Sequence, residues 1–295
     1  MSFQGKLKRY LLILERMAYR PTFAELKAHL EEQGFEISAR TLQRDIEQVR
    51  IELGLEIAYD RNSNTYHLAD GPDDRAAILP LLERAVLGEL LAAAGGTIRQ
   101  AAPHVVIECN GSLKGLHHWG SLLRAIRERR EVVVSYQRFQ TERVAQIRLR
   151  PVLLKEFRER WYVLGPAFTY DDPISLGLDR ILGLRLTGTR FSAQLRDAVE
   201  AFYAPVIGVD SSPGKAERVV LRFTPLQGKY VKALPLHTSQ RVVQDDAKGC
   251  VVELLVMTNY ELRQELLGLG SAVEVLEPKA LRTAIAAEHR KAALR

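Results

Sequence analysis

The stretch that decides the N-terminal fold spans residues 38–53 and reads Ser-Ala-Arg-Thr-Leu-Gln-Arg-Asp-Ile-Glu-Gln-Val-Arg-Ile-Glu-Leu. Ser38 is a good helix N-cap, because its hydroxyl can accept a hydrogen bond from a free backbone N–H of the first turn. Apolar residues then recur at helical spacing and predict a stripe that faces a core: Leu42, Ile46, Val49 and Leu53. The stretch therefore predicts an amphipathic helix that begins directly after Ser38.

The polar residues near the start of this helix lie off the apolar stripe: Arg40, Thr41, Gln43 and Arg44. Arginine can bind guanine and glutamine can bind adenine through two hydrogen bonds, and threonine can contact a phosphate or a thymine methyl group. These residue types therefore suit DNA recognition, and the alternative is the charged face of an ordinary surface helix. Asp45 follows them, and because phosphate repels a carboxylate, we expect Asp45 to brace Arg40 or Arg44.

The neighbouring segments predict two more helices and a β-hairpin. A first amphipathic helix is expected over residues 7–17, and Thr22 can cap a second helix. After the quoted stretch, two short β-type segments at residues 55–59 and 65–68 flank a polar turn, which is typical of a hairpin. Three helices followed by a hairpin predict a winged helix-turn-helix domain over residues 1–70.

This N-terminal pattern resembles the DNA-binding module of DeoR-like and WYL-domain regulators. The resemblance is carried by Ser38, Arg40-Thr41, Arg44-Asp45 and Tyr66-x-Leu68. It implies that double-stranded operator DNA is a partner of the chain. The candidate DNA-binding residues are Ser38, Arg40, Thr41, Gln43, Arg44 and, near the tip of the hairpin, Arg61.

The composition is that of a globular protein of two or three domains, with 295 residues, 46% hydrophobic and 26% charged. No apolar run is long enough to cross a bilayer, and the first residues do not resemble a secretion signal. The only cysteines, Cys109 and Cys250, suggest neither a disulfide framework nor a zinc site. We therefore expect a cytoplasmic protein without a membrane partner.

The positive charge is concentrated in the middle of the chain. Residues 121–160 contain 11 Lys and Arg against 5 Asp and Glu, which equals the net charge of +6 of the whole chain. Residues 1–70 contain 10 against 11, so a single DNA-binding module should bind weakly and a homodimer is expected to read two half-sites. Residues 71–120 are rich in Ala and Leu and are predicted to form a helical linker with a role in dimerisation.

Several short strands with tight connections are predicted after residue 130, which favours a small barrel or a strongly bent sheet. The segment 146–154 alternates basic and apolar residues, so Arg148 and Arg150 share one face of a strand. In Arg160-Trp161-Tyr162, successive side chains point to opposite faces, so at least one of the two aromatic residues is expected in a core.

These strands resemble the WYL domain over residues 121–190. The motifs are Arg160-Trp161-Tyr162-Val163-Leu164, the preceding Arg150-Pro151-x-x-Leu154 and the following Leu178-Asp179-Arg180-Ile181. Val163 replaces the commoner leucine, and Gly177 stands where the family usually has an arginine. The resemblance implies an Sm-like β-barrel that senses a nucleotide or a nucleic-acid fragment.

The candidate effector-binding residues combine cations for phosphate with aromatic rings for stacking: Tyr136, Arg148, Arg150, Arg160, Trp161, Tyr162 and Arg180. A merely solvated barrel face is the alternative for Arg148 and Arg150. Their convergence with Arg160 and Arg180 on one pocket stays open at this point.

Residues 215–295 resemble the C-terminal extension of the same regulators. The resemblance is carried by Arg218-Val-Val-Leu-Arg222-Phe223, Leu236-His237-Thr238-Ser239-Gln240 and Leu269-Gly270-x-x-Val273-Glu-Val-Leu-Glu277-Pro278. The alternation of strands and helices predicts a ferredoxin-like α+β domain. The whole chain is thus expected to be an α+β multidomain protein.

Catalysis has little support, because the sequence contains none of the common nucleotide-binding, zinc-protease or serine-hydrolase motifs. His117-His118 is expected to be a surface pair and not a metal site. We therefore predict a ligand-responsive transcription regulator, neither an enzyme nor a cofactor protein. The alternatives are a nucleic-acid-processing enzyme with a DNA-binding appendage and an RNA-binding adaptor.

Overall fold

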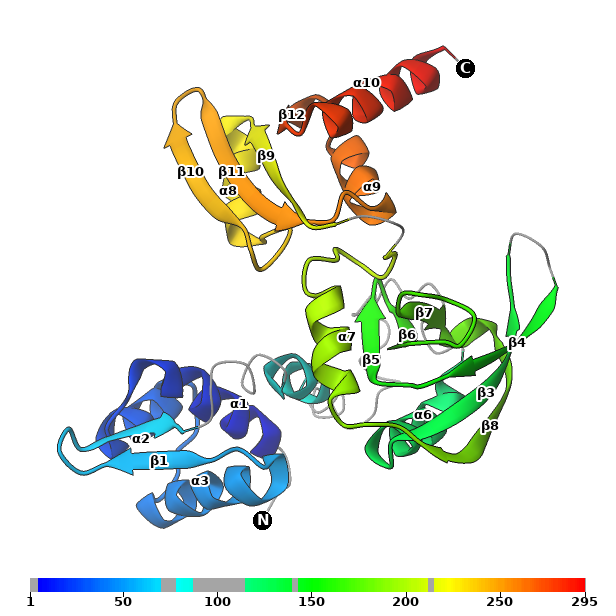
Figure 1. Cartoon of the computed structure of the whole chain (residues 1–295). Helices are drawn as coiled ribbons and strands as arrows, with labels where there is room; N and C mark the ends of the chain where they lie inside the picture. Colours follow the sequence, from blue (N-terminus) through cyan, green and yellow to red (C-terminus); the bar gives the residue numbers. More distant parts are fainter. Residues whose placement is uncertain (1–4, 70–77, 87–114, 140–142, 212–214, 295) are drawn as a thin grey trace, which may run out of the picture. The chain divides into compact units, whose positions relative to one another are not determined.

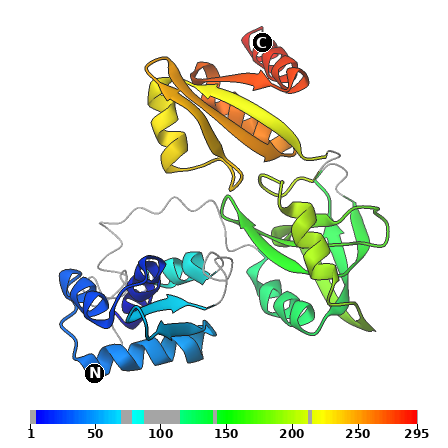
Figure 2. The same ribbon diagram turned by 60° about the vertical axis from the view of Figure 1, so that its left-hand side comes forward.

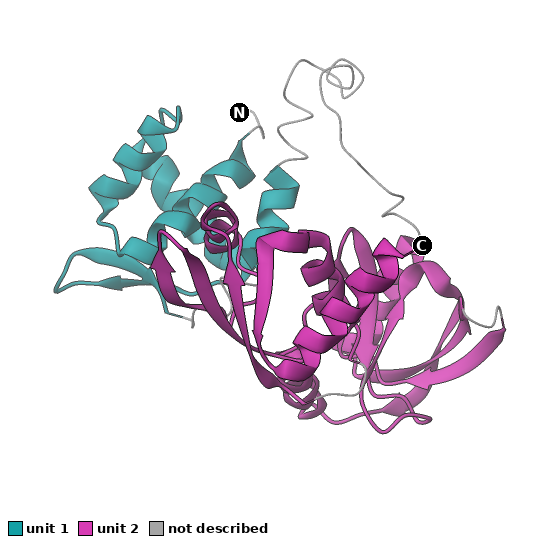
Figure 3. Cartoon of the chain, turned by 90° about the horizontal axis from the view of Figure 1, so that it is seen from above, with its two compact units in different colours: residues 1–108 teal, residues 109–295 magenta. Residues whose placement is uncertain are grey.

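The structure is a computed structural model that describes residues 5–69, 78–86, 115–139, 143–211 and 215–294. It contains helices and several antiparallel sheets (Figures 1 and 2). The chain divides into two compact units, residues 1–108 and 109–295 (Figure 3). Within the described residues, no helix has the length and apolar character needed to cross a membrane.

The first unit has the predicted order of helices and strands: α1 (Lys6–Arg16), α2 (Phe23–Glu32), α3 (Ala39–Leu53), β1 (Ile57–Asp60) and β2 (Thr65–Leu68). Thr22 forms a capping box with Glu25, whose carboxylate accepts a bond from the Thr22 N–H. The Ser38 Oγ accepts a bond of 3.1 Å from the Thr41 N–H. Both predicted N-caps are therefore confirmed, and β1 and β2 form the predicted antiparallel hairpin.

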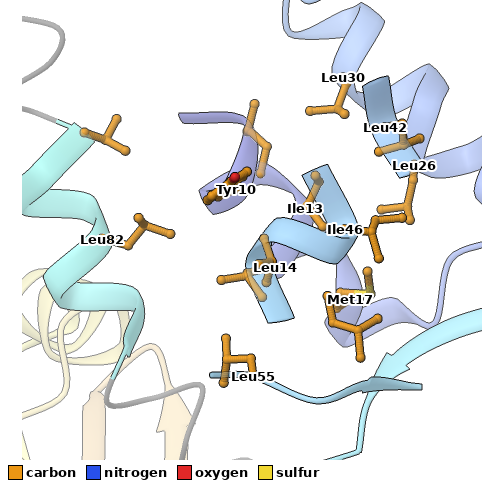
Figure 4. Close-up of a cluster of buried hydrophobic side chains, with 14 residues drawn as sticks. Tyr10, Ile13, Leu14, Met17, Leu26, Leu30, Leu42, Ile46, Leu55 and Leu82 are labelled. Carbon is orange, nitrogen blue, oxygen red and sulfur yellow. The ribbon is translucent and has the colours of Figure 1, made fainter. Parts of the chain in front are cut away.

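The three helices bury one apolar core, and a further helical segment packs against it (Figure 4). Tyr10, Ile13 and Leu42 are fully buried in this core. Residues 78–86 are helical and add Leu82 and Val86, each only 5% exposed. Of the linker predicted over residues 71–120, residues 71–77 and 87–114 lie outside the described residues, and residues 116–120 are helical and belong to the second unit.

The second unit begins with two three-stranded antiparallel sheets, with strand orders β4-β3-β8 and β5-β6-β7. Their elements are α6 (Trp119–Arg127), β3 (Arg130–Gln137), β4 (Val144–Leu149), β5 (Leu153–Phe157), β6 (Arg160–Gly165), β7 (Ile174–Gly177) and β8 (Ile181–Arg190). A shared core lies between the sheets and α6 and includes Leu122, Val132, Val134 and Val163. This body corresponds to the predicted small, strongly bent β-structure.

The predicted closed barrel is wrong for the described strands. Among the strands that the structure describes, no ladder joins the two sheets apart from one isolated bridge between Leu149 and Ala167. Pro151 and Pro166 both lie on one side of this bridge, because Leu149 and Ala167 pair in the antiparallel sense. Neither proline has an N–H to donate, so a regular ladder is interrupted on that side. The result is a pair of bent sheets around one core.

The last part of the chain follows α7 (Leu195–Tyr203) and has β-α-β-β-α-β order. Its elements are β9 (Glu217–Phe223), α8 (Pro225–Ala233), β10 (Arg241–Asp246), β11 (Gly249–Val256), α9 (Tyr260–Leu269), β12 (Val273–Glu277) and a terminal helix, α10 (Lys279–Ala293). The four strands form one antiparallel sheet in the order β10-β11-β9-β12. Leu221, Phe223 and Val252 are buried in the core of this sheet.

The segment between α7 and β9 is anchored to the start of α9. Asn259 Nδ2 donates to the carbonyl oxygens of Ile207, at 2.7 Å, and Asp210, at 2.8 Å. The buried Glu261 Oε1 accepts from the N–H groups of Val209, at 3.2 Å, and Asp210, at 3.0 Å. Four backbone polar groups of residues 207–210 are therefore bonded to side chains at the start of α9.

Candidate nucleic-acid and effector sites

The N-terminal end of α3 presents three of the predicted DNA-binding side chains to solvent. Arg40, Gln43 and Arg44 are exposed, and within the described residues neither arginine has an ion-pair partner. Thr41 is half-buried, and its Oγ1 lies 3.0 Å from the Ser38 Oγ. Ser38 and Thr41 thus fix the start of the helix, and Arg40, Gln43 and Arg44 are free to contact a ligand.

Asp45 does not brace Arg40 or Arg44, so that prediction is wrong. It is 1% exposed and accepts two bonds from Arg9 of α1: Nε to Oδ2 at 2.6 Å and Nη2 to Oδ1 at 3.2 Å. Asp45 lies directly before Ile46 and four residues before Val49, both buried in the core. Its helical position therefore turns it toward α1 and away from the polar end.

Arg61 lies in the turn between β1 and β2 and is exposed, again without a partner among the described residues. Asp60 holds the turn, because its carboxylate accepts bonds from the Asn62 N–H at 2.8 Å and the Ser63 hydroxyl at 2.7 Å. Asn64 completes the turn in the left-handed region, with φ of 57°. This rigid turn leaves the guanidinium of Arg61 available.

In the second unit, three of the predicted effector residues come together with two others. We name this group the Tyr136 cluster: Tyr136, Phe139, Arg160, Asp179 and Arg180. The Arg180 guanidinium carbon lies 5.1 Å from the centre of the Tyr136 ring and 4.8 Å from that of Phe139. Arg160 forms an ion pair with Asp179, and its guanidinium carbon lies 6.0 Å from the centre of the Phe139 ring. Burial raises the pKa of the Tyr136 phenol, and Arg180 beside it partly offsets this.

Because Gly177 has no side chain, Asp179 and Arg180 of the Tyr136 cluster can pack directly against its backbone. A Cβ atom on residue 177 would lie 2.6 Å from Asp179 Oδ1 and 3.1 Å from Arg180 Nη2. The arginine that the family usually carries here would therefore displace both side chains. Asp179 Oδ1 and Arg180 Nε are buried and have no hydrogen-bond partner among the described residues.

Arg148 and Arg150 belong to a different group, the Glu131 cluster: Glu131, Arg148, Arg150 and Phe168. Arg148 donates to Glu131 Oε2 from Nε at 2.8 Å and from Nη2 at 2.5 Å. Arg150 Nε donates to Glu131 Oε1 at 3.0 Å. The guanidinium carbons of Arg148 and Arg150 lie 4.2 Å and 4.6 Å from the centre of the Phe168 ring.

The two clusters start from opposite faces of β3. Side chains alternate along a strand, so Glu131 and Tyr136, five residues apart, point to opposite sides. Val132 and Val134 share the Tyr136 side and are buried in the core. The structure thus groups Arg160 and Arg180 with Tyr136, and it groups Arg148 and Arg150 with Glu131.

Trp161 and Tyr162 both pack into apolar surroundings. Trp161 is half-buried and meets Trp119 edge to face, with ring centres 6.0 Å apart. Tyr162 is 9% exposed and lies in a second core with Val152 and Leu164. Strand alternation predicted at least one core residue in this pair, and Tyr162 is that residue, whereas Trp161 is half-buried.

Sequence reasoning missed Phe139, Phe168, Glu131 and Asp179 as parts of these clusters. Asp179 stands beside Arg180 in the recognised motif, so this adjacency was an available signal. Phe168 follows β6 and is brought to Arg148 by a bond of 3.2 Å from its N–H to the Arg148 carbonyl. Contacts across strands of this kind leave no periodic trace in a sequence.

No group of three metal-binding side chains occurs among the residues that the structure describes. His117 and His118 lie with ring centres 3.9 Å apart, and His118 Nε2 lies 3.1 Å from the Ile181 carbonyl oxygen. Burial lowers the pKa of His118. The pair is therefore part of the packing of the short helix before α6 against β8.

Two family models match the second unit. The WYL domain matches residues 117–186 and the WCX domain matches residues 215–293. The first match contains both clusters, and the second contains the β-α-β-β-α-β sheet. The chain therefore belongs to the WYL-domain proteins, in the form that carries a C-terminal WCX domain.

Among solved structures, the chain is similar to proteasome accessory factor B/C (PafBC) of Arthrobacter aurescens, with 18% identity over 95% of this chain and a TM-score of 0.34. It spans about half of the PafBC chain, 47%. It is also similar to a CRISPR Cas-related protein, with 12% identity, 99% of this chain, 86% of the other and a TM-score of 0.43.

Proposed function

We propose that the chain is a DNA-binding transcription regulator whose first unit reads operator DNA as a winged helix-turn-helix. The observation that carries the proposal is the polar end of α3, where Arg40, Gln43 and Arg44 are exposed on a capped and well-packed helix. Bidentate base recognition needs side chains that are not already paired, and these fit that need. The WYL and WCX matches support the same class of protein.

The hairpin supplies the wing in this proposal. Arg61 at its tip contacts a phosphate of the backbone, while α3 enters the major groove. The Asp60 turn keeps the tip in one conformation, which lowers the entropy cost of the contact. Base contacts by Arg44 then provide sequence specificity, and Arg61 provides affinity that does not depend on sequence.

The WYL domain senses an anionic effector, a nucleotide or a nucleic-acid fragment. The Tyr136 cluster supports this proposal, since Arg160 and Arg180 lie with the rings of Tyr136 and Phe139 in one place. Arginines recognise phosphate and aromatic rings stack on bases. Arg148 and Arg150 are further candidates for phosphate, whereas Trp161 and Tyr162 contribute as walls of the domain.

The chain acts as a homodimer in the cytoplasm, without catalytic activity. The near-neutral charge of residues 1–70 supports a dimer, because two modules on two half-sites combine their affinities. The WCX domain supports the dimer in this scheme.

Selection of genomic DNA fragments by the purified protein tests the proposal. We expect a small set of enriched duplex sequences with two related half-sites about one helical turn, or a multiple of it, apart. Titration of one enriched duplex, a scrambled duplex and an RNA of the same sequence then measures specificity. Equal affinity for all three would contradict an operator-reading regulator and favour an RNA-binding adaptor.

A further inference from the structure

We propose that the Glu131 cluster is an anion site separate from the Tyr136 cluster and that it binds a phosphate group. This inference deepens the proposed function, because it divides the effector-binding arginines into two independent sites. It concerns phosphate binding by the WYL domain alone.

The first argument is the charge balance of the Glu131 cluster. Glu131 is 1% exposed, so its carboxylate needs a cationic partner. One bidentate arginine is enough for this purpose, as the Arg9–Asp45 pair demonstrates, with side chains only 13% and 2% exposed. Glu131 has two arginines instead, so the cluster keeps a surplus positive charge.

The second argument is the number of donors that remain. Arg148 uses Nε and Nη2 for Glu131, and Arg150 uses only Nε. Among the described residues, Arg148 Nη1 and both terminal nitrogens of Arg150 donate to nothing else. The two side chains are 48% and 38% exposed, so these donors are open to solvent. Forked N–H groups of this kind match the oxygen atoms of a phosphate.

The third argument is that the arginines are held in place before any ligand binds. Glu131 fixes their Nε edges, and the Phe168 ring packs on both guanidinium groups. The bond from the Phe168 N–H to the Arg148 carbonyl keeps the ring in register with β4. A free surface arginine loses rotamer entropy when it binds, and here much of this entropy is already lost in folding.

The same face of the sheet extends the positive field. Val133 of β3 pairs with Arg148 on one side and with Arg185 of β8 on the other. Cross-strand partners point to the same face, so Arg185 lies two strand spacings, about 10 Å, from Arg148. Arg185 is exposed and, within the described residues, has no ion-pair partner. A ligand with more than one phosphate can therefore contact both strands.

Calorimetric titration of the full chain tests the proposal with three probes: pyrophosphate, a mononucleotide and a short oligothymidylate. Three variants are compared with the wild type, namely the double variant Arg148→Ala/Arg150→Ala, Arg180→Ala from the Tyr136 cluster, and Arg196→Ala. Arg196 is a matched control, because it is a 65% exposed arginine in a helical ion pair on α7.

We expect the double variant to weaken binding at the new site by at least about tenfold, equivalent to about 1.4 kcal/mol. Arg180→Ala and Arg196→Ala should leave this site unchanged, and the affinity of the wild type should fall as salt is raised. If only pyrophosphate binds, the ligand of the Glu131 cluster is a small anion. If oligothymidylate binds more tightly, the ligand is a nucleic-acid backbone.

Removal of both arginines leaves Glu131 buried without a cation, so the double variant can fail to fold. The double variant Arg148→Lys/Arg150→Lys avoids this problem, because it keeps both charges and removes the planar forks. We expect it to fold and still to lose the phosphate affinity. The proposal is overturned if the wild type binds none of the probes, if the lysine variant binds like the wild type, or if Arg180→Ala abolishes all binding. No operator duplex is present in these titrations, so their outcome is independent of whether the first unit reads DNA.

Discussion

Arg9 and Asp45 join α1 to α3 through a buried, two-point ion pair, and this pair keeps the Asp45 charge away from solvent. The Asp45 carboxylate is taken by Arg9, so it does not neutralise Arg40 or Arg44. The negative charge closest in sequence to the proposed base-reading side chains is thus turned into the protein. Without this pairing, Asp45 would weaken the field that attracts a phosphate backbone.

We expect Asp45→Ala to destabilise the first unit by about 3–5 kcal/mol, because it leaves the Arg9 guanidinium, 13% exposed, without its anion. The simultaneous replacement Arg9→Met/Asp45→Leu should restore most of the stability. Hydrogen exchange of α1 and α3 in the full chain measures the effect on this unit alone. Glu31→Ala removes an exposed helical pair with Lys27 and is the control, with an expected change of less than about 0.5 kcal/mol. If the amides of α1 and α3 are equally protected from exchange in the Asp45→Ala and Glu31→Ala variants, the buried pair does not stabilise the first unit.

Arg44→Ala should weaken binding to an enriched operator duplex by about 1–3 kcal/mol and should reduce the preference over a scrambled duplex. Arg61→Ala should weaken both duplexes evenly, because a phosphate contact carries no sequence information. Fluorescence anisotropy titrations measure both effects, and Lys291→Ala in α10 controls for the loss of one exposed charge. If Arg44→Ala binds the operator as the wild type does, Arg44 is not a base-reading residue.

Arg180→Ala should abolish the response of operator binding to the effector and leave binding without effector unchanged. The physical reason is that Arg180 is the member of the Tyr136 cluster that meets both aromatic rings. Anisotropy with operator DNA, repeated in the presence of short single-stranded oligonucleotides and cyclic nucleotides, tests this. A variant that keeps the full response would remove Arg180 from the effector site.

Much of the local structure was predictable, because it depends on short-range rules. The caps at Thr22 and Ser38 and the hairpin after α3 follow from residue types at fixed offsets, and all are present. The strand and helix order of residues 217–277 follows from alternation and breaks in the same way. These features need no knowledge of distant contacts.

The features that the sequence could not predict all depend on which distant residues meet. Asp45 finds Arg9, 36 positions away, and Glu131 finds Arg148 and Arg150, 17 and 19 positions away. The closed barrel failed for a related reason, since closure depends on the pairing of sheet edges and not on the pattern within a strand. Phe168 and Phe139 lie in connections, where hydrophobic periodicity carries no information.

Acid should loosen the contact between His237 and the end of α7. His237 Nε2 lies 2.8 Å from the Ala204 carbonyl, so it donates there, and Nδ1 accepts from the Ser239 N–H at 3.1 Å. Burial lowers the pKa of His237 below its ordinary value of 6.5, and nearby Lys155 acts in the same direction. Between the lowered value and 6.5 the unfolded state binds more protons, so stability falls as the pH falls through this window.

Hydrogen exchange of residues 237–240 at about pH 7.5 and about pH 5.5, corrected for intrinsic rates, measures this loss. His237→Gln is the matched variant, because its amide can donate to Ala204 and accept from Ser239 without titrating. The pKa of His118 is also lowered by burial, so only the difference between wild type and His237→Gln reports on His237. The same pH dependence in both proteins would contradict the prediction.

Light scattering at micromolar concentration should give a mass of about twice the 33.3 kDa of one chain. The reason is the weak net charge of residues 1–70, which favours two modules on one operator. A protein that stays monomeric and still binds a palindromic duplex tightly would contradict the dimer.

The packing of residues 78–86 has a practical consequence for anyone who wishes to excise the DNA-binding unit. Leu82 and Val86 are 5% exposed and close the core formed by α1 and its neighbours. A fragment that ends after the hairpin would expose that side of the core to water. Such an exposed apolar patch promotes aggregation and lowers solubility. The smallest piece that keeps its own interior covered therefore extends through Val86.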